Sequence, residues 1–233
     1  MLADDAPTFQ GPNIAIETAK SFIPASIEYF QDQPGWMANM PLAFPNAYNE
    51  AVSSTTATGN GTTQPEGILT ALMATTTSPA HTVVQTAGTL GAVDLQNAWY
   101  AVPERFRARA SWMFHRTVAQ RISALAASAA IASGDWHTLP NGQHLLFGMP
   151  CYEVDAFPAL TNSTAGTVAF AVVGDFKSGY AVPQRVGGFT QELIPHLRDP
   201  ITPRPTGQRA ALAVCRFGGG LIVPTALVVV ANS

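Results

Sequence analysis

Acidic side chains and histidines are the residues of this chain that are best suited to chemistry, and they are widely dispersed. Glu153 and Asp155 are two residues apart in a segment predicted to be a strand, so their carboxylates would point the same way. Such a pair can divide general acid and general base work in a small hydrolase. A solvated strand end explains the pair more simply, and we favour that interpretation.

Metal and cofactor chemistry finds no support in the motifs. The five histidines are His81, His115, His137, His144 and His196. None has an acidic or histidine partner at metal-ligand spacing, and H-E-x-x-H, C-x-x-C, G-x-S-x-G and G-x-x-x-x-G-K-[ST] do not occur. We therefore expect no enzyme, no metal and no cofactor. A hydrolase that uses Glu153, Asp155 or a histidine is kept as the enzymatic alternative.

Basic residues gather at one place, with Arg105, Arg107, Arg109 and Arg116 close together in the sequence. Such a cluster suits a solvated patch, a contact between subunits, or phosphate binding. Phosphate binding is disfavoured because no aromatic side chains alternate with the arginines in a stacking arrangement. Gly59-Asn60-Gly61 begins like a phosphate loop, but Gln64 stands where G-x-G-x-x-G needs its third glycine. A plain turn is the favoured prediction there.

The composition limits the class of protein. Of 233 residues only 12% are charged, where a soluble domain usually has about 25%. Twelve basic and fifteen acidic side chains give a net charge of -3, and the only lysines are Lys20 and Lys177. These values exclude a basic nucleic-acid-binding protein of the usual kind. A surface so poor in charge favours a chain that is largely covered by partners.

Compartment and membrane signals are few. Cys151 and Cys215 make no disulfide framework, so both are predicted to be reduced and buried in an intracellular product. The longest apolar stretch, Leu221 to Ala231, contains Pro224 and is about half a membrane span. Residues 1–10 carry two acids and no apolar run, so no signal peptide is expected. We expect a soluble chain with no membrane partner.

The first half of the chain is predicted to mix helices, loops and one strand. The expected elements are a strand over Phe9 to Pro24, two short helical pieces between Ser26 and Ala51, and an irregular surface stretch from Val52 to Thr77. Two helices follow, Leu95 to Val102 with Asp94 as N-cap, and Ser111 to Ala130, whose apolar face includes Trp112 and Ile122. A kink is expected near Met40 to Pro45, because Pro41 and Pro45 each remove a backbone donor at a cost of ~3 kcal/mol inside a helix.

Strands dominate after Leu145. The expected strands are Val168 to Val173, Tyr180 to Val182, Phe189 to Ile194, Ala210 to Phe217 and Leu221 to Val230. The first of them is an almost continuous apolar run, which is typical of a strand covered on both faces. With no internal repeat and no heptad pattern, the chain is predicted to be α+β.

Five blocks along the chain share the sequence pattern of one family. They are Gly59–Leu69, Pro103–Arg116, Leu146–Glu153, Gly174–Tyr180 followed by Arg185, and Arg209 to Val230. The first four match "GdGt-x-qP-x-Gil", "p-x-r-y-r-x-x-a-x-w-v-m-n-r", "LlGyPvve" and "GDf-x-x-gY", with Phe147 in place of a usual Leu. Each block alone is weak, but five in the right order are specific. The chain thus resembles the major capsid proteins of tailed bacteriophages, which have the Hong Kong phage capsid fold.

The resemblance implies a fold and a role. The fold would be the α+β phage major capsid fold, with peripheral and axial domains and a remnant of the extended loop. The implied division is 1–24 for the return strand of that loop, 25–92 for the first part of the peripheral domain, 93–210 for the axial domain and 211–233 for strands that return to the peripheral domain. Rings of five and six subunits would tile an icosahedral head that encloses double-stranded DNA in the virion, after synthesis in the cytoplasm of a bacterial host.

Copies of the same chain are the main partners that the resemblance implies, with scaffold, portal and decoration proteins as further candidates. Rings need interfaces that close by rotation, and a stable contact buries ~1,200–2,000 Å². A chain with few charges loses less to desolvation when several faces are covered. The candidate interface residues are Glu104, Arg105, Arg107, Arg109, Arg116, Asp175 and Arg185.

The sequence also departs from the family. It begins at what resembles the return strand of the extended loop, Thr8 to Lys20, so the N-terminal arm and the outgoing strand are expected to be missing, and rings or ill-defined aggregates are expected instead of closed shells. The long helix of the peripheral domain should lie near Pro34 to Ala51, where two prolines occur. Some relatives form a Lys–Asn crosslink assisted by a Glu. Here no acid follows Asp199 and neither lysine lies at the tip of a complete loop, so no crosslink is expected.

One alternative keeps the fold and changes the contents of the shell. The shell protein of an encapsulin-like bacterial nanocompartment would enclose enzymes instead of DNA. The block Gln64-Pro65-Glu66-Gly67 favours the phage protein.

Overall fold

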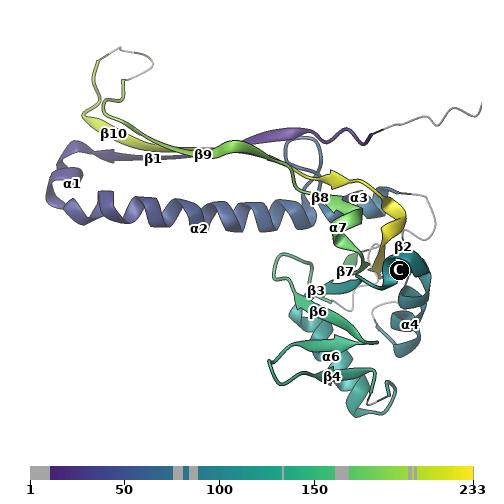
Figure 1. Cartoon of the computed structure of the whole chain (residues 1–233). Helices are drawn as coiled ribbons and strands as arrows, with labels where there is room; N and C mark the ends of the chain where they lie inside the picture. Colours follow the sequence, from purple (N-terminus) through teal and green to yellow (C-terminus); the bar gives the residue numbers. More distant parts are fainter. Residues whose placement is uncertain are drawn as a thin grey trace, which may run out of the picture.

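The chain folds into a compact body and a long ribbon that extends from it (Figure 1). The computed structural model describes residues 11–75, 81–83, 89–132, 134–160, 168–198, 201 and 204–232. The expectations for residues 1–10, including the start of the first strand, lie outside these residues. Helices and sheets are mixed, as predicted.

Three antiparallel strands of equal length form the ribbon. They are β1 (Ile16–Ser26), β9 (Gln184–Ile194) and β10 (Gln208–Gly218), in the order β1-β10-β9. The pairing of β1 with β10 runs without a break from Ile16 opposite Gly218 to Ser26 opposite Gln208. Exposed and half-buried residues alternate along β1, so one of its faces is turned to solvent. The expected strand is confirmed from Ile16 onward.

A single long helix lies along the other face of the ribbon (Figure 1). At the tip, the Ser26 hydroxyl accepts a hydrogen bond from the Tyr29 N–H and caps α1 (Ile27–Asp32). The next helix, α2 (Pro34–Thr58), has 25 residues and returns toward the body. The chain therefore reverses direction at the tip, and the helix and strands share one long contact.

The predicted kink in this helix is wrong, because α2 continues through Pro41 and Pro45. Each proline removes one N–H, which leaves the carbonyl four residues earlier without its helical donor. The two prolines are themselves four residues apart, so the missing bonds lie on the same side of the helix. The strain is thus confined to one side, and the contact with the ribbon supplies stability that local propensity does not.

The irregular stretch predicted for Val52 to Thr77 is also wrong in large part. Helix α2 continues to Thr58, and α3 (Ile68–Ala74) follows after a turn of nine residues, 59–67. Gly67 lies against the end of α2, where a Cβ would come within 2.3 Å of the Gly59 nitrogen. Only glycine fits there, which explains why this turn carries so marked a sequence pattern.

A mixed sheet of seven strands forms the centre of the body. Its order is β2-β12-β7-β3-β6-β5-β4, and two of its pairings, β2 with β12 and β3 with β6, are parallel. The strands are β2 (His81–Val83), β3 (Ser111–Phe114), β4 (Trp136–Thr138), β5 (His144–Leu146), β6 (Met149–Glu153), β7 (Ala169–Gly174) and β12 (Leu227–Ala231).

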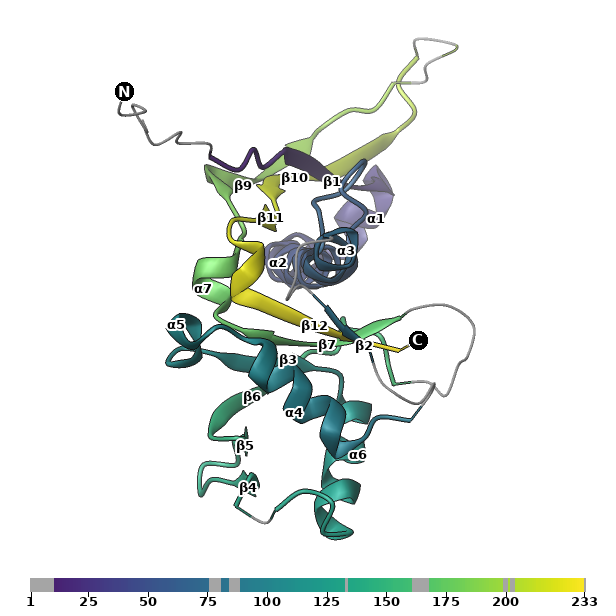
Figure 2. The same ribbon diagram turned by 90° about the vertical axis from the view of Figure 1, so that its right-hand side faces the viewer.

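Helices cover both faces of this sheet (Figure 2). On one face lie α4 (Ala92–Ala101) and α6 (Arg116–Ala127), and on the other α3 and the end of α2. Alternate residues of β12 enter the two clusters: Val228 and Val230 pack on the first side, Leu227 and Val229 on the second. Every residue of β7 is buried, which confirms the strand predicted to be covered on both faces.

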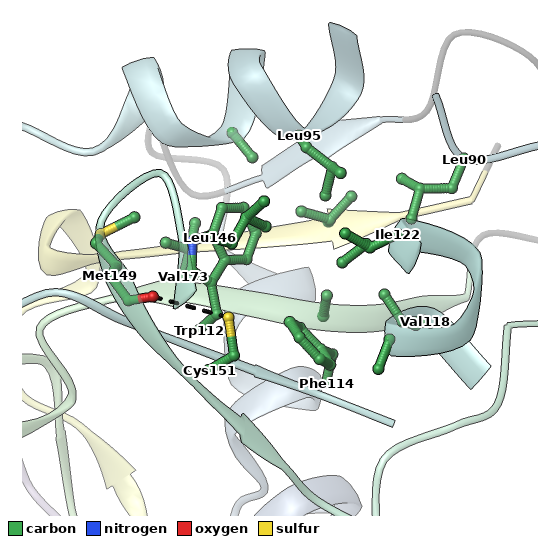
Figure 3. Packing of buried hydrophobic residues seen from close by; sticks show 14 of the residues in the cluster. Leu90, Leu95, Trp112, Phe114, Val118, Ile122, Leu146, Met149, Cys151 and Val173 are labelled. Carbon is green, nitrogen blue, oxygen red and sulfur yellow. Dashed lines mark hydrogen bonds between the residues drawn. The ribbon is translucent and has the colours of Figure 1, made fainter. Parts of the chain in front are cut away.

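The core under α4 and α6 is built around two aromatic side chains of β3 (Figure 3). Trp112 and Phe114 are fully buried and point into the cluster that contains Leu95 and Ile122. The helix predicted over Ser111 to Ala130 is therefore wrong in its first turn. Residues 111–114 alternate half-buried and buried as a strand, and α6 begins only at Arg116 after a cap by His115.

The other helix of this core, α4, begins earlier than predicted. Its N-cap is Gly91, and Asp94 lies at the third helical position, where its carboxylate accepts a hydrogen bond from the Gly91 N–H. The predicted capping role is thus performed from inside the helix.

Short elements connect body and ribbon. They are α7 (Phe176–Gly179), the paired strands β8 (Tyr180–Ala181) and β11 (Gly220–Leu221), and a 3₁₀ turn at Pro224–Ala226. The short helix α5 (Glu104–Arg107) instead links α4 to β3 within the body. The strands predicted near 180, 189–194 and 210–217 are confirmed. The strand predicted over Leu221 to Val230 is divided by Pro224 into β11 and β12.

Both cysteines are free thiols and buried, as predicted. Burial raises the pKa of the Cys151 thiol to about 12, so it stays protonated and packs as a small apolar side chain. In the part of the chain that the structure describes, no helix combines the length and the apolar character needed to cross a membrane.

Candidate subunit-interface site

Two of the candidate residues meet directly although they are far apart in the sequence. The Arg109 guanidinium donates to Asp175 at 2.8 Å and to the Ser178 hydroxyl at 3.1 Å. The Asp175 side chain is only 2% exposed, whereas that of Arg109 is 61% exposed. The Arg109 cation therefore lies at the surface, and the buried Asp175 carboxylate holds it in place.

Asp175 also caps α7. Its carboxylate accepts hydrogen bonds from the N–H groups of Lys177 and Ser178 and from the Ser178 hydroxyl. Burial alone would raise the pKa of Asp175, but the Ser178 hydroxyl and the Arg109 cation outweigh burial and hold this pKa below its usual value. One ionised carboxylate thus ties the start of α7 to the segment that leads into β3.

Arg107 is committed to its own subunit. Its guanidinium donates to the carbonyls of Val102 and Tyr100, at 2.8 and 3.0 Å. The same group lies over the Trp99 ring, 4.7 Å from the centroid. The arginine therefore closes the end of α4, where helical carbonyls have no partner within the helix.

Glu104 and Arg105 are exposed on α5. Arg105 lies over the Phe106 ring, 4.6 Å from the centroid, and reaches the Thr225 hydroxyl at 3.4 Å. These contacts are weak and open to solvent. Both charged groups are thus accessible to another molecule.

Arg116 lies close to one of the two candidate acid–base carboxylates, Asp155, at the surface. Asp155 is 86% exposed and lies 3.7 Å from Arg116 and 3.8 Å from the His115 ring. Asp155 follows the end of β6 and is not within it, so the strand predicted to align Glu153 and Asp155 ends too early. A carboxylate this exposed is in contact with solvent, which matches the solvated strand end of our prediction.

Arg185 lies apart from the other six, on β9 of the ribbon, and is exposed. Its neighbour Val186 is 99% exposed. The structure thus divides the candidates between the surface of the body and the ribbon.

The turn that resembles a phosphate loop is filled by its own side chain. The Asn60 Oδ1 atom accepts hydrogen bonds from the N–H groups of Thr62, Thr63 and Gln64, at 3.0–3.2 Å. These donors are the ones that a phosphate would need. The plain turn is confirmed. Among the described residues, no three His, Cys, Asp or Glu side chains gather as a metal site would require.

Two of the matched sequence blocks meet at this turn. The Tyr180 hydroxyl donates to the Glu66 carbonyl, and burial together with the nearby Glu66 carboxylate raises the pKa of Tyr180. A Cβ on Gly219 would collide with that hydroxyl. The contact joins the α2–α3 turn to the strands that lead into the ribbon.

Exposed apolar side chains of the ribbon are the features that the candidate set missed. Ile16, Phe22, Val186 and Leu193 are all exposed, and Phe22 is half accessible. The described part of the chain provides little apolar core beneath the ribbon: one cluster of buried residues, made of Phe44, Ala211 and Ala213. One sequence signal could have identified these residues. Strand β1 has apolar residues at both even and odd positions, such as Phe22 and Ile23, and this pattern predicts a strand that is covered on two faces.

The described residues thus place exposed apolar side chains on a long ribbon that projects from the body. The phage capsid family model matches residues 1–232. The chain therefore belongs to the phage capsid family, a family of structural proteins, as the resemblance implied. No curated protein matches the chain.

Solved structures share the fold. The capsid of the native GTA particle is 19% identical with a TM-score of 0.68, over 100% of this chain and 80% of that one. Gordonia phage Cozz is 16% identical with a TM-score of 0.60, over 100% and 77%. The SrpI encapsulin of Synechococcus elongatus PCC 7942 is 14% identical with a TM-score of 0.61, over 93% and 74%. At such identities the likeness establishes the phage major capsid fold.

Proposed function

We propose that this chain is a major capsid protein that assembles with copies of itself into rings of five and six subunits, which tile the icosahedral head of a phage. The head encloses double-stranded DNA. The observation that carries the proposal is the ribbon, because four of its described apolar side chains, Ile16, Phe22, Val186 and Leu193, are exposed. Membership of the phage capsid family supports the same role.

The ribbon needs neighbours for a physical reason. Phe22 is 50% exposed and Val186 99% exposed, on strands that project from the body. Apolar side chains that leave water contribute about 25 cal/mol per Å². An extended ribbon offers many such side chains along its length, and a neighbouring subunit would bury them. Contacts of this kind, repeated by rotation, close a ring.

The charge of the chain fits a wall around DNA. The net charge is -3 and only two side chains are lysines. A wall of this composition holds a packed polyanion by enclosure, without many phosphate contacts. We therefore propose that DNA is enclosed and not bound at a specific site.

The candidate residues divide by what they can reach. Glu104, Arg105, Arg116 and Arg185 are exposed and are proposed to contact neighbouring subunits. Arg109 is also proposed to contact a neighbouring subunit, while its ion pair with Asp175 holds it in place. Asp175 is buried, so its proposed role in the interface is to position Arg109. Arg107 supports the site from within, by holding the end of α4.

The division into domains stays a proposal. Residues 1–24 are proposed to form the return strand of the extended loop, 25–92 the first part of the peripheral domain, 93–210 the axial domain, and 211–233 the strands that return to the peripheral domain. Strand β9 lies before the boundary at 210 yet pairs with β10 and shares its sheet with β1, so the ribbon takes strands from both sides of that boundary. Scaffold, portal and decoration proteins, and synthesis in a bacterial cytoplasm, belong to the same proposal.

Electron microscopy of the purified chain tests this function. We expect rings of five or six subunits at micromolar concentration. Particles from cells, treated with nuclease and then opened, should release double-stranded DNA. A chain that stays monomeric at all concentrations would overturn the proposal.

The encapsulin-like alternative predicts different contents. The fold is shared with the SrpI encapsulin, so shape alone does not separate the two roles. Shells that release a second protein and no nuclease-resistant DNA would favour the nanocompartment.

A further inference from the structure

The outer edge of β1 is open. In the ribbon order β1-β10-β9, β10 is central, and among the described residues no strand pairs with the other side of β1. An edge of this kind presents a row of unpaired N–H and C=O groups. The edge has 11 residues, which is long for an unprotected strand.

Hydrogen bonds around the ribbon show which residues of β1 face outward. The Ile27 N–H donates to the Gly207 carbonyl, which continues the β1–β10 register. On β10, Gln208 accepts from Leu197 and Gly218 donates to Pro183, both on the side away from β1. Odd residues of β1 therefore bond to β10, and even residues direct their N–H and C=O groups outward.

Pro24 agrees with this assignment and limits the open edge. It is an even residue of β1, so its missing N–H falls on the outer side, where proline is tolerated. No further strand can receive a hydrogen bond at that point. The usable edge thus extends from Ile16 to Phe22, with the backbone groups of Ile16, Thr18, Lys20 and Phe22 directed outward.

We infer that this edge pairs with the same edge of a second copy, antiparallel and about a two-fold axis at Ala19. Ile16 then lies opposite Phe22 of the partner subunit, and Thr18 lies opposite Lys20 of the partner subunit. The two ribbons become one continuous sheet of six strands. The inference rests on the proposed function, since it names the contact through which two rings join.

This register is favoured by the side chains. The even side chains share the exposed face of β1, where Ile16 is 44% and Phe22 50% exposed. Each pairing of Ile16 with the partner's Phe22 covers apolar surface on both chains, and the two-fold axis repeats it. Lys20 meets a hydroxyl and not a charge.

Neighbouring registers are worse. A shift by two in one direction places Lys20 opposite the partner's Lys20, and Pro24 opposite the partner's Ile16, where one donor is missing. A shift by two in the other direction places Lys20 opposite the partner's Ile16. Like charges directly opposite and unpaired backbone groups both destabilise a sheet. Lys20 and Pro24 therefore select one register, and they hinder pairing with unrelated strands.

Thiol crosslinking tests the register. Thr18→Cys and Lys20→Cys chains are purified separately, mixed under assembly conditions and oxidised mildly. Directly opposed residues lie ~5.5 Å apart at the Cα atoms, within reach of a disulfide. We expect a covalent dimer, reversed by reductant, in the mixture and in neither variant alone. Thr18→Cys mixed with Ser21→Cys is the matched control, because its thiols lie on opposite faces.

A backbone variant tests the same contact without cysteine. Thr18→Pro removes an N–H that has no partner among the described residues, so the ribbon keeps its internal bonds. Thr18→Val keeps the N–H and the β-branched shape, and serves as control. Because the two-fold axis repeats the change, we expect Thr18→Pro to weaken two-fold association about tenfold or more in sedimentation experiments, and Thr18→Val to leave it unchanged.

The outcomes separate this inference from the proposed function. Rings or particles without the Thr18–Lys20 dimer would overturn the edge pairing and leave the capsid role standing. The dimer without rings would support the pairing and count against the capsid role. Equal dimer yields from each single variant would overturn the inference, as would a dimer that forms only after deletion of residues 1–10, because that segment would then be the natural occupant of the edge.

Discussion

The sheet of the body and the sheet of the ribbon bury their side chains in opposite ways. In the body, β7 and β12 are buried at every residue between helices of the same chain. In the ribbon, β1 alternates exposed and half-buried residues above one helix. The body thus buries its apolar strands within the chain, whereas the ribbon leaves apolar side chains such as Phe22 exposed. Substitutions in the two regions should therefore affect different properties.

The largest expected effect is in the body. Trp112→Ala empties the centre of the core under α4 and α6, and we expect the free energy of unfolding to fall by about 3–5 kcal/mol. Among the described residues, the Trp112 Nε1 atom has no hydrogen-bond partner, so Trp112→Phe should cost clearly less. Chemical denaturation followed by circular dichroism measures both. Equal losses for the two variants would contradict the core packing described above.

Asp175 is expected to come next. Asp175→Ala leaves Arg109 and the N–H groups of α7 without their acceptor, and we expect a loss of about 2 kcal/mol. Ser178→Ala, which removes one donor only, is the matched control and should cost less. A variant as stable as the natural chain would show that the contact does not hold α7.

The same carboxylate predicts a dependence on pH. Since the pKa of Asp175 is lowered in the folded chain, its contribution is present above the ordinary aspartate range and is lost as the pH falls through the folded value. Thermal unfolding between pH 7 and pH 2 should therefore show a smaller loss on acidification for Asp175→Asn than for the natural chain. Parallel curves would refute the assignment.

In the ribbon, substitutions should spare folding and impair assembly. Phe22→Ala removes a half-exposed ring, so we expect the free energy of unfolding of the monomer to change by less than about 1 kcal/mol. Assembly into rings of subunits or into particles should nevertheless fall sharply, because the Phe22 side chain is proposed to pack between subunits. Sedimentation and electron microscopy, compared with denaturation, separate the two effects. A large loss of monomer stability would place Phe22 in the fold of the single chain.

The smallest effect is expected beneath the ribbon, where a cavity of about 110 Å³ lies against α2. Ala213 lines this cavity and is buried on β10. Ala213→Val adds two methyl groups to a strand position that suits a β-branched residue, and we expect a gain of about 0.5–1 kcal/mol. Hydrogen exchange of β10 should slow. Faster exchange would show that the cavity is too narrow for the added methyl groups.

The sequence predicts the body's strands better than its helix boundaries. The apolar run of β7 is short and ends at Gly174, which favours a strand covered on both faces over a buried helix. The 3.6-residue spacing between Trp112 and Ile122 predicts a helix, whereas the shorter alternation of Trp112 with Phe114 is that of the strand β3. The start of α6 is set by His115, whose ring accepts the Thr117 N–H, and histidine is not among the preferred caps.

Tertiary contacts explain the other differences. Nothing in the local sequence of α2 offsets Pro41 and Pro45, and two of the three strands that lie along the helix, β9 and β10, are formed by residues more than a hundred positions later. The candidate site was predicted from charges, so Arg109 and Asp175 were found but their pairing was not. The exposed apolar residues of the ribbon were missed because a single sequence does not reveal which apolar residues stay uncovered.

Helix α2 has mechanical meaning beyond its place in the fold. The helix has 25 residues and is ~37 Å long. The two backbone hydrogen bonds that its prolines remove lie on one side, one turn apart. A helix of this kind bends most readily about one axis, at the turn where Pro41 and Pro45 remove two backbone hydrogen bonds. A capsid wall built from identical subunits would contain this bendable turn in every subunit. Pressure from inside would then be taken up by small bends in many helices, and not by the separation of one interface between subunits.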